Sequence, residues 1–138
     1  MVLPSAVALL ATALLLGGMG FFAAVLAPLV FTALPADASG PFIRRVFPAY
    51  YLWVIASAAV GALALLPLRL PDALGLALVA GSTVWLRQGL MPRINAMSDA
   101  AQAGNAAAKA GFARAHQLSV LVNVAQMLVA LVVLVRFA

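Results

Sequence analysis

The fold of this chain is decided by its first apolar run, which reads VLPSAVALLATALLLGGMGFFAAVLAPLVFTAL from Val2 to Leu34. No residue in this run carries a charge. About 20 helical residues cross the roughly 30 Å hydrocarbon core of a bilayer, so the run is more than long enough to span a membrane. It therefore predicts a transmembrane helix.

The composition of the whole chain points to the same solvent. Hydrophobic residues make up 67% of the 138 residues and charged residues only 8%, whereas soluble domains average about 45–50% apolar and about 25% charged residues. A soluble core of this size cannot hide so much apolar surface. The lipid bilayer is therefore expected to cover the rest and is the predicted partner of the chain. The chain has no cysteine, which excludes disulfides, thiolate metal sites and cysteine nucleophiles.

Further apolar runs follow, so that four spans are predicted in a single domain that covers residues 1–138. The predicted spans are about residues 3–34, 44–66, 73–91 and 115–135. A turn is expected at residues 36–41, which read ADASGP, and short connections favour antiparallel neighbours. The polar residues 92–114 predict a short extramembrane helical segment. The predicted fold is an all-α membrane protein, an antiparallel four-transmembrane-helix bundle with this segment between helices 3 and 4.

The charges predict how the chain is threaded. Most basic residues flank the first and third connections: Arg44, Arg45, Arg87, Arg93, Lys109 and Arg114. Only Arg69 and Arg136 fall on the other side. The positive-inside rule then predicts a multi-pass protein of the cell inner (plasma) membrane with both termini outside the cytoplasm. Basic residues spread in this way follow topology, and no nucleic-acid partner is expected.

Small residues at four-residue spacing predict places where helices pack closely. They are Gly20, Ala24 and Pro28 in the first run, Ser57 and Gly61 in the second, and Ala73, Ala77 and Gly81 in the third. Such spacings also arise by chance in alanine-rich helices, so the pattern alone leaves both readings open.

A polar stripe on the fourth run is the main indication of a site. His116, Ser119, Asn123 and Gln126 follow at intervals of three, four and three, which places them on one helix face. Because polar groups facing lipid are costly, the stripe is expected to face the bundle interior or a water-filled cavity. The candidate ligand-binding cluster, with residues expected at the same depth, comprises His116, Ser119, Asn123, Tyr50, Tyr51, Arg87 and Asn95.

Ordinary structural roles account for the same residues. Asn123 and Ser119 can hydrogen-bond to neighbouring helices, and the tyrosines fit an interfacial aromatic belt. Arg87 can extend its side chain to the lipid headgroups. Whether the cluster binds a ligand or only packs is left open by the sequence.

Catalysis and metal binding find little support in the residue types. The acidic residues are Asp37, Asp72 and Asp99, all in predicted connections, so no pair of carboxylates is expected for acid–base or di-iron chemistry. One histidine without a buried carboxylate builds neither a zinc centre nor a Ser–His–Asp triad. No metal or cofactor is expected, with haem b as the one alternative: His116 would be an axial ligand, opposite Met91 or a second copy of His116.

Four segments of the chain resemble the transmembrane protein 205-like family. They read GGMGFFAAVLAPLVFTALP (17–35), GPFIRRVFPAYY (40–51), MPRINAM (91–97) and FARAHQLSVLVN (112–123). The resemblance implies a small four-helix membrane protein, catalogued as a domain of unknown function, with marked residues near one membrane face. These positions are Pro28, Phe31, Phe47, Pro48, Tyr50, Pro92, Asn95, His116, Ser119 and Asn123. The resemblance supplies no reaction.

Three functions stay open at this point. The first is solute or ion binding and permeation through the polar cluster, which would require a homo-oligomer because four short helices enclose little volume. The second is an accessory or assembly subunit of a larger membrane complex, for example a respiratory one, that packs through the small-residue seams. The third is a haem-binding protein that uses His116.

Overall fold

The computed structural model describes residues 1–138 and contains only helices and short turns. The elements are α1 (Val2–Phe21), η1 (Phe22–Leu26), α2 (Ala27–Ala33), α3 (Ala36–Leu65), α4 (Leu70–Trp85), η2 (Leu86–Leu90), α5 (Met91–Gln102) and α6 (Ala106–Val135). The π-helical segments η1 and η2 continue the α-helices on either side, so the chain forms four rods. The predicted all-α class is confirmed.

Three of these rods are long and apolar enough to cross a membrane: Val2–Ala33, Ala36–Leu65 and Ala106–Val135. The remaining rod runs through α4, η2 and α5 and carries the predicted span 73–91, but its apolar helix α4 has only 16 residues. Length and composition therefore identify a membrane protein.

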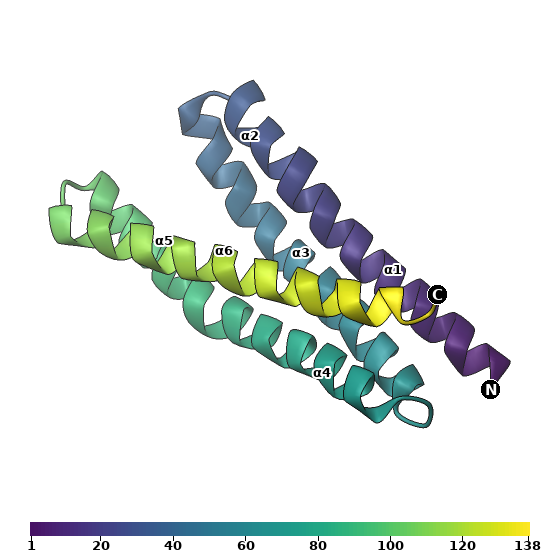
Figure 1. The fold of residues 1–138 in the computed structure, drawn as a ribbon. Helices are drawn as coiled ribbons and strands as arrows, with labels where there is room; N and C mark the ends of the chain where they lie inside the picture. Colours follow the sequence, from purple (N-terminus) through teal and green to yellow (C-terminus); the bar gives the residue numbers. More distant parts are fainter.

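The four rods form two pairs that diverge from one end of the molecule to the other (Figure 1). The first pair is α1–η1–α2 with α3, and the second pair is α4–η2–α5 with α6. The pairs contact each other through α3 with α4 and through α1 with α6. Both termini and the α3–α4 turn lie at the narrow end, which we call the terminal end. At the other, open end, α2 and the start of α3 stand apart from α5 and the start of α6.

The turn predicted at residues 36–41 is wrong, because α3 already begins at Ala36. Pro35 is the N-cap, and its carbonyl oxygen accepts hydrogen bonds from the backbone N–H groups of Ala38 (3.0 Å) and Ser39 (2.9 Å). Asp37 lies in the first turn, where the helix dipole favours a negative charge. These start signals outweigh the turn propensity of the small residues and leave Pro41 inside the helix.

The segment predicted to be helical between the third and fourth spans is helical, but it is divided between two rods. α5 extends the third rod to Gln102, and α6 begins at Ala106. Gly104 takes a φ of +96° in the turn between them, a conformation that glycine adopts without a Cβ penalty. The Asn105 side chain accepts a hydrogen bond from the Ala108 N–H at 3.0 Å and caps α6.

The core lies where α1, α3 and α4 meet. Its largest fully buried apolar side chains are Leu15, Met19, Leu65, Leu76, Leu86, Val54 and Val79. A Cβ added at Gly61 would stand 2.8 Å from Leu76 Cδ1 and 3.6 Å from Thr12 Oγ1, so a larger residue here would force the buried Leu76 side chain to shift. Gly20 and Gly81, in contrast, have no such neighbour within 4 Å.

Candidate functional site

Two adjoining pockets, which share lining residues, form a cleft between the two helix pairs toward the open end. Its deeper part, the inner cleft, has a volume of about 300 Å³ and lies between η1, α3 and α6. The part nearer the open end, the outer cleft, has a volume of about 190 Å³ and is lined mainly by α3, α5 and α6. Five residues line both parts: Phe31, Ile43, Phe47, His116 and Ser119.

Stacked aromatic rings form one wall of the inner cleft. The ring of Phe22 stacks on that of Tyr50, with centroids 4.1 Å apart and an interplanar angle of 17°. Phe47 lies 5.3 Å from Phe22 and 5.6 Å from Tyr51. Tyr50 and Tyr51 are only 8% and 4% exposed. Their rings are therefore packed inside the protein, unlike the exposed rings of an interfacial belt.

One hydrogen bond crosses the inner cleft from α3 to α6. The Tyr50 hydroxyl donates to Asn123 Oδ1 at 2.7 Å, and Asn123 Nδ2 donates to the Met127 sulfur at 3.7 Å. The structure thus brings together two predicted site residues that stand 73 positions apart. The hydrogen bond fixes the orientation of the Asn123 side-chain amide, and both Tyr50 and Asn123 still line the cleft.

His116 and Ser119 lie where the inner and outer clefts join. The Ser119 hydroxyl donates to the backbone oxygen of His116 at 2.7 Å, which leaves its own oxygen able to accept. The His116 ring stacks on Phe112, with centroids 5.9 Å apart and an interplanar angle of 8°. The imidazole forms no hydrogen bond within the chain, so its two nitrogens are available to a ligand.

The outer cleft contains a cation that the candidate cluster did not include. Arg44 of α3 donates through Nη2 to Asp99 Oδ1 at 2.7 Å and to the Asn95 backbone oxygen at 3.3 Å, both on α5. Arg44 lines the outer cleft together with Asn95 and Ser98. In the sequence, Arg44 served only to predict orientation. Its partner lies 55 residues away, and no local pattern reveals this pairing.

Arg87 and Gln126 lie outside the cleft. Arg87 stands on η2 and does not line either part. Gln126, the last residue of the polar stripe, is 5% exposed and donates through Nε2 to Ser82 Oγ (2.7 Å) and Thr83 Oγ1 (3.0 Å) of α4. The stripe on α6 is therefore divided: its first three residues face the cleft, and its last binds the neighbouring helix.

Haem ligation by His116 and Met91 stays a prediction. Both residues line the outer cleft. Their shared position is compatible with haem ligation but does not test it. No group of three or more His, Cys, Asp or Glu side chains is placed to hold a metal ion.

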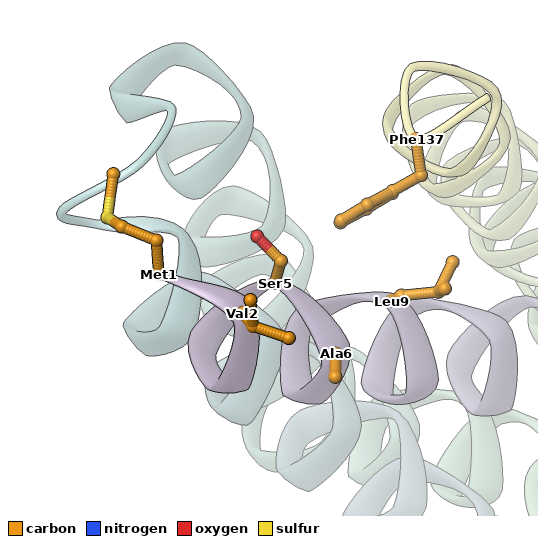
Figure 2. A pocket seen from close by; sticks show the side chains of 6 residues that line it. All are labelled: Met1, Val2, Ser5, Ala6, Leu9 and Phe137. Atoms are coloured by element: carbon orange, nitrogen blue, oxygen red, sulfur yellow. The ribbon is translucent and has the colours of Figure 1, made fainter.

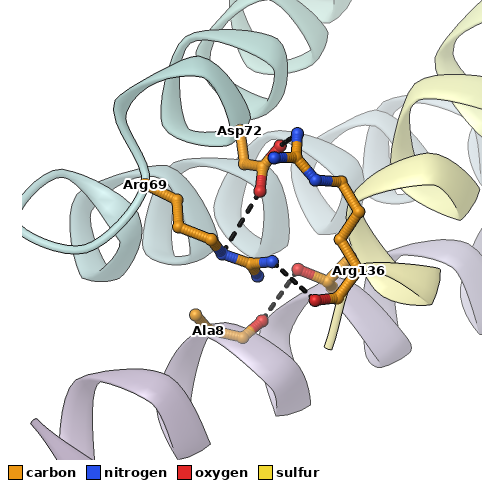
Figure 3. Close-up of polar contacts among 5 residues, drawn as sticks. Ala8, Arg69, Asp72 and Arg136 are labelled. Carbon is orange, nitrogen blue, oxygen red and sulfur yellow. Dashed lines mark hydrogen bonds and ion pairs between the residues drawn. The ribbon is translucent and has the colours of Figure 1, made fainter. Parts of the chain in front are cut away.

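A buried ion cluster at the terminal end was missed by the sequence interpretation, which expected no buried carboxylate. Asp72 is 4% exposed and lies in the first turn of α4. Its Oδ1 is 2.6 Å from Arg136 Nη1, its Oδ2 is 3.2 Å from Arg69 Nε, and Arg69 Nη1 donates to the Arg136 backbone oxygen at 2.8 Å (Figure 3). The cluster fastens the α3–α4 turn to the end of α6. The one signal of this cluster in the sequence was the spacing of three residues between the oppositely charged Arg69 and Asp72.

A shallow groove lies between the start of α1 and the C-terminal residues (Figure 2). Its volume is about 490 Å³, and it is lined by Met1, Val2, Ser5, Ala6, Leu9 and Phe137. Ser5 is its only polar side chain, so this groove lacks the convergent polar groups that fix a ligand's orientation.

The family of the chain follows from comparison with known proteins. A family model described as a domain of unknown function (DUF4149) matches residues 10–103. The chain belongs to this family. No curated protein and no solved structure matches it. The DUF4149 match confirms a domain of unknown function, as the resemblance implied, but does not carry the transmembrane protein 205-like name. The matched residues include Tyr50 and Asn95 and end before His116, Ser119 and Asn123.

Proposed function

We propose that this DUF4149-family membrane protein binds a lipid or a lipid-like amphiphile in the cleft between its helix pairs. The observation that carries the proposal is the difference in lining between the two adjoining parts of the cleft. Eleven of the 14 residues around the inner cleft are hydrophobic, whereas only six of 12 are hydrophobic around the outer cleft. An apolar tail and a polar head would each meet a matching surface.

The polar groups would supply the affinity. An acyl chain that moves from the bilayer into the inner cleft exchanges one apolar surrounding for another, so little hydrophobic free energy is gained. The hydrogen-bonding groups of His116, Ser119 and Asn123 lie beside the cleft at fixed positions. A few convergent polar groups in an apolar pocket are the usual source of orientation and specificity.

The structure favours binding over permeation. Beyond the inner cleft, toward the terminal end, the interior is filled by fully buried apolar side chains such as Leu15, Val54 and Leu76. A polar path for an ion would have to continue through this region, where the buried polar side chains of Thr12, Thr83 and Gln126 are already hydrogen-bonded within the chain. The guanidinium of Arg44 also disfavours a cation among the solutes and ions that the sequence left open.

A matched pair of variants on adjacent residues tests the proposal. Ala23 and Ala24 are both exposed, but only Ala23 lines the inner cleft. A23F would fill the cleft and is expected to weaken binding of a pyrene-labelled phosphatidylcholine about tenfold or more, by overpacking. A24F should bind the probe as the unmodified protein does. Equal binding by both variants, with both folded in detergent, would contradict a ligand in the cleft.

A second candidate, a subunit of a homo-oligomer or larger membrane complex, is favoured by one observation. On the first rod, Gly17 and Ala24 are exposed, and nothing lies within 4 Å of a Cβ added at Gly17 or Gly20. Small residues on an outer face let a second helix approach closely. Because the chain lacks cysteine, G17C should form a disulfide-linked dimer under oxidation, and V60C, exposed on α3, should not.

We also propose the membrane orientation that the distribution of basic residues predicts. The open end carries the basic residues of the first and third connections, which supports placing it in the cytoplasm and both termini outside the inner membrane. A103C, in the α5–α6 turn, should then react with a membrane-impermeant thiol reagent only after the cytoplasmic face is made accessible. Labelling from the outer face of intact cells would overturn this orientation.

A further inference from the structure

We infer that the ligand of the cleft is an anionic phospholipid whose phosphate is held by Arg44, and that Asp99 competes with this phosphate for the guanidinium. The inference rests on the proposed function and names the ligand class. It depends on three observations: the position of Arg44 in the cleft, the exposure of its partner, and the excess of positive charge at the open end.

Arg44 is placed to hold an anion and still has donors to offer. Its side chain is 34% exposed and lines the outer cleft. Within the chain it donates through Nη2 alone, to Asp99 and to the Asn95 backbone oxygen. A guanidinium has five N–H donors in a planar fork that matches the oxygens of a phosphate. Nε and Nη1 therefore keep their donors for a ligand.

The carboxylate of Asp99 is a replaceable partner. Its side chain is 63% exposed, so it returns to water at little cost when Arg44 turns to another anion. Ion pairs at this degree of exposure contribute only a small stabilisation. The 2.7 Å contact also shows that an oxygen anion beside the outer cleft is within reach of Arg44. We read Asp99 as an internal competitor whose removal strengthens binding.

The surroundings of Arg44 complete a headgroup site. Ser98, Asn95 and His116 line the same part of the cleft and offer further polar groups to phosphate and glycerol ester oxygens. From there, Phe47 leads into the inner cleft, since it lines both parts. Basic residues at this end outnumber Asp37 and Asp99. Basic pockets between membrane helices are established binding sites for anionic lipid headgroups.

The test compares dioleoyl phosphatidylglycerol with dioleoyl phosphatidylcholine, which have the same tails and differ in net charge. Binding to the purified full chain in detergent is measured by native mass spectrometry. The unmodified protein should prefer phosphatidylglycerol. R44Q should weaken its binding about tenfold, as expected for loss of a charge-assisted contact, and leave phosphatidylcholine binding nearly unchanged. R45Q removes the same charge from an exposed neighbour outside the cleft and should have little effect.

Asp99 is tested in the opposite direction. D99N should tighten phosphatidylglycerol binding about two- to fivefold, the range expected for loss of one exposed ion pair. D37N removes an exposed carboxylate with no ion pair at the same end of the molecule and should not. Equal binding of both lipids, or equal effects of R44Q and R45Q, would overturn the inference. The proposed function would still be supported if A23F loses lipid binding. If neither lipid binds, the proposed function fails as well.

Discussion

The two ends of this molecule both hold an arginine–aspartate contact, but in opposite surroundings. At the terminal end Asp72 is 4% exposed and lies between two arginines (Figure 3). At the open end Asp99 is 63% exposed and has Arg44 alone. The first contact fastens two rods where they converge, and the second joins two rods where they diverge (Figure 1). An arginine–aspartate contact thus holds two rods together as a buried ion pair at one end, and is an exposed, exchangeable ion pair at the other.

The difference follows from the cost of removing charges from water. Breaking a buried ion pair strands an uncompensated charge, which costs about 3–5 kcal/mol, whereas an exposed pair contributes about 0–1 kcal/mol. The terminal end is therefore expected to set the stability of the fold. The open end can exchange Asp99 for a ligand without loss of structure, and this makes a binding role at that end compatible with a stable protein.

The largest expected effect comes from breaking the buried ion pair. D72N leaves Arg69 and Arg136 without their counter-charge and should lower the free energy of unfolding by about 3 kcal/mol, near the lower limit for a buried pair because the Arg136 side chain is 52% exposed. Unfolding in mixed micelles by a denaturing detergent measures the change. D99N is the matched control and should cost less than about 1 kcal/mol. Equal losses would mean that burial does not distinguish the ion pairs at the two ends.

A smaller effect is expected where the helix pairs first meet. G61V places a side chain against Leu76 and Thr12 and should destabilise the fold by about 1–3 kcal/mol through overpacking. G81V adds the same side chain to an exposed position with no neighbour within 4 Å, so it controls for helix propensity. If G81V is as damaging as G61V in the same unfolding assay, the close approach of α1, α3 and α4 is not what stabilises this region.

Much of the fold was predictable because apolar length dominates in a membrane protein. The runs that begin at Val2 and end near Val135 predicted helices whose existence the structure confirms. The turn at residues 36–41 was misplaced because local turn propensity was weighed without the cap at Pro35. The divergence of the two pairs could not be predicted. Lipid is as apolar as leucine, so no hydrophobic term forces helices in a bilayer to close into a compact bundle.

The candidate site was predictable in part. The period of α6 identified His116, Ser119 and Asn123, which do line one cleft with Tyr50. Arg44 could not be assigned, since its contacts on α5 lie more than 50 positions away. The same holds for Asp72, which meets Arg136 across 64 positions. Periodicity reports which face of a helix a residue shares, but not which rod that face will meet.

The smallest expected effect separates the two halves of the polar stripe on α6. N123L removes the acceptor of the buried Tyr50 hydroxyl and should cost about 1 kcal/mol. Because Asn123 lines the inner cleft, this change should also weaken binding of pyrene-labelled phosphatidylcholine. Q126L removes donors to Ser82 and Thr83 outside the cleft.

Hydrogen bonds between membrane helices average about 0.6 kcal/mol, so Q126L should lower stability by about that amount and leave lipid binding unchanged. The hydroxyls of Ser82 and Thr83 would still donate to the Val79 backbone oxygen, which limits the damage. Detergent unfolding and lipid binding measured on the same preparations distinguish the two variants. Equal lipid binding by N123L and Q126L would remove Asn123 from the site and restrict the polar part of the cleft to the open end, around His116 and Arg44.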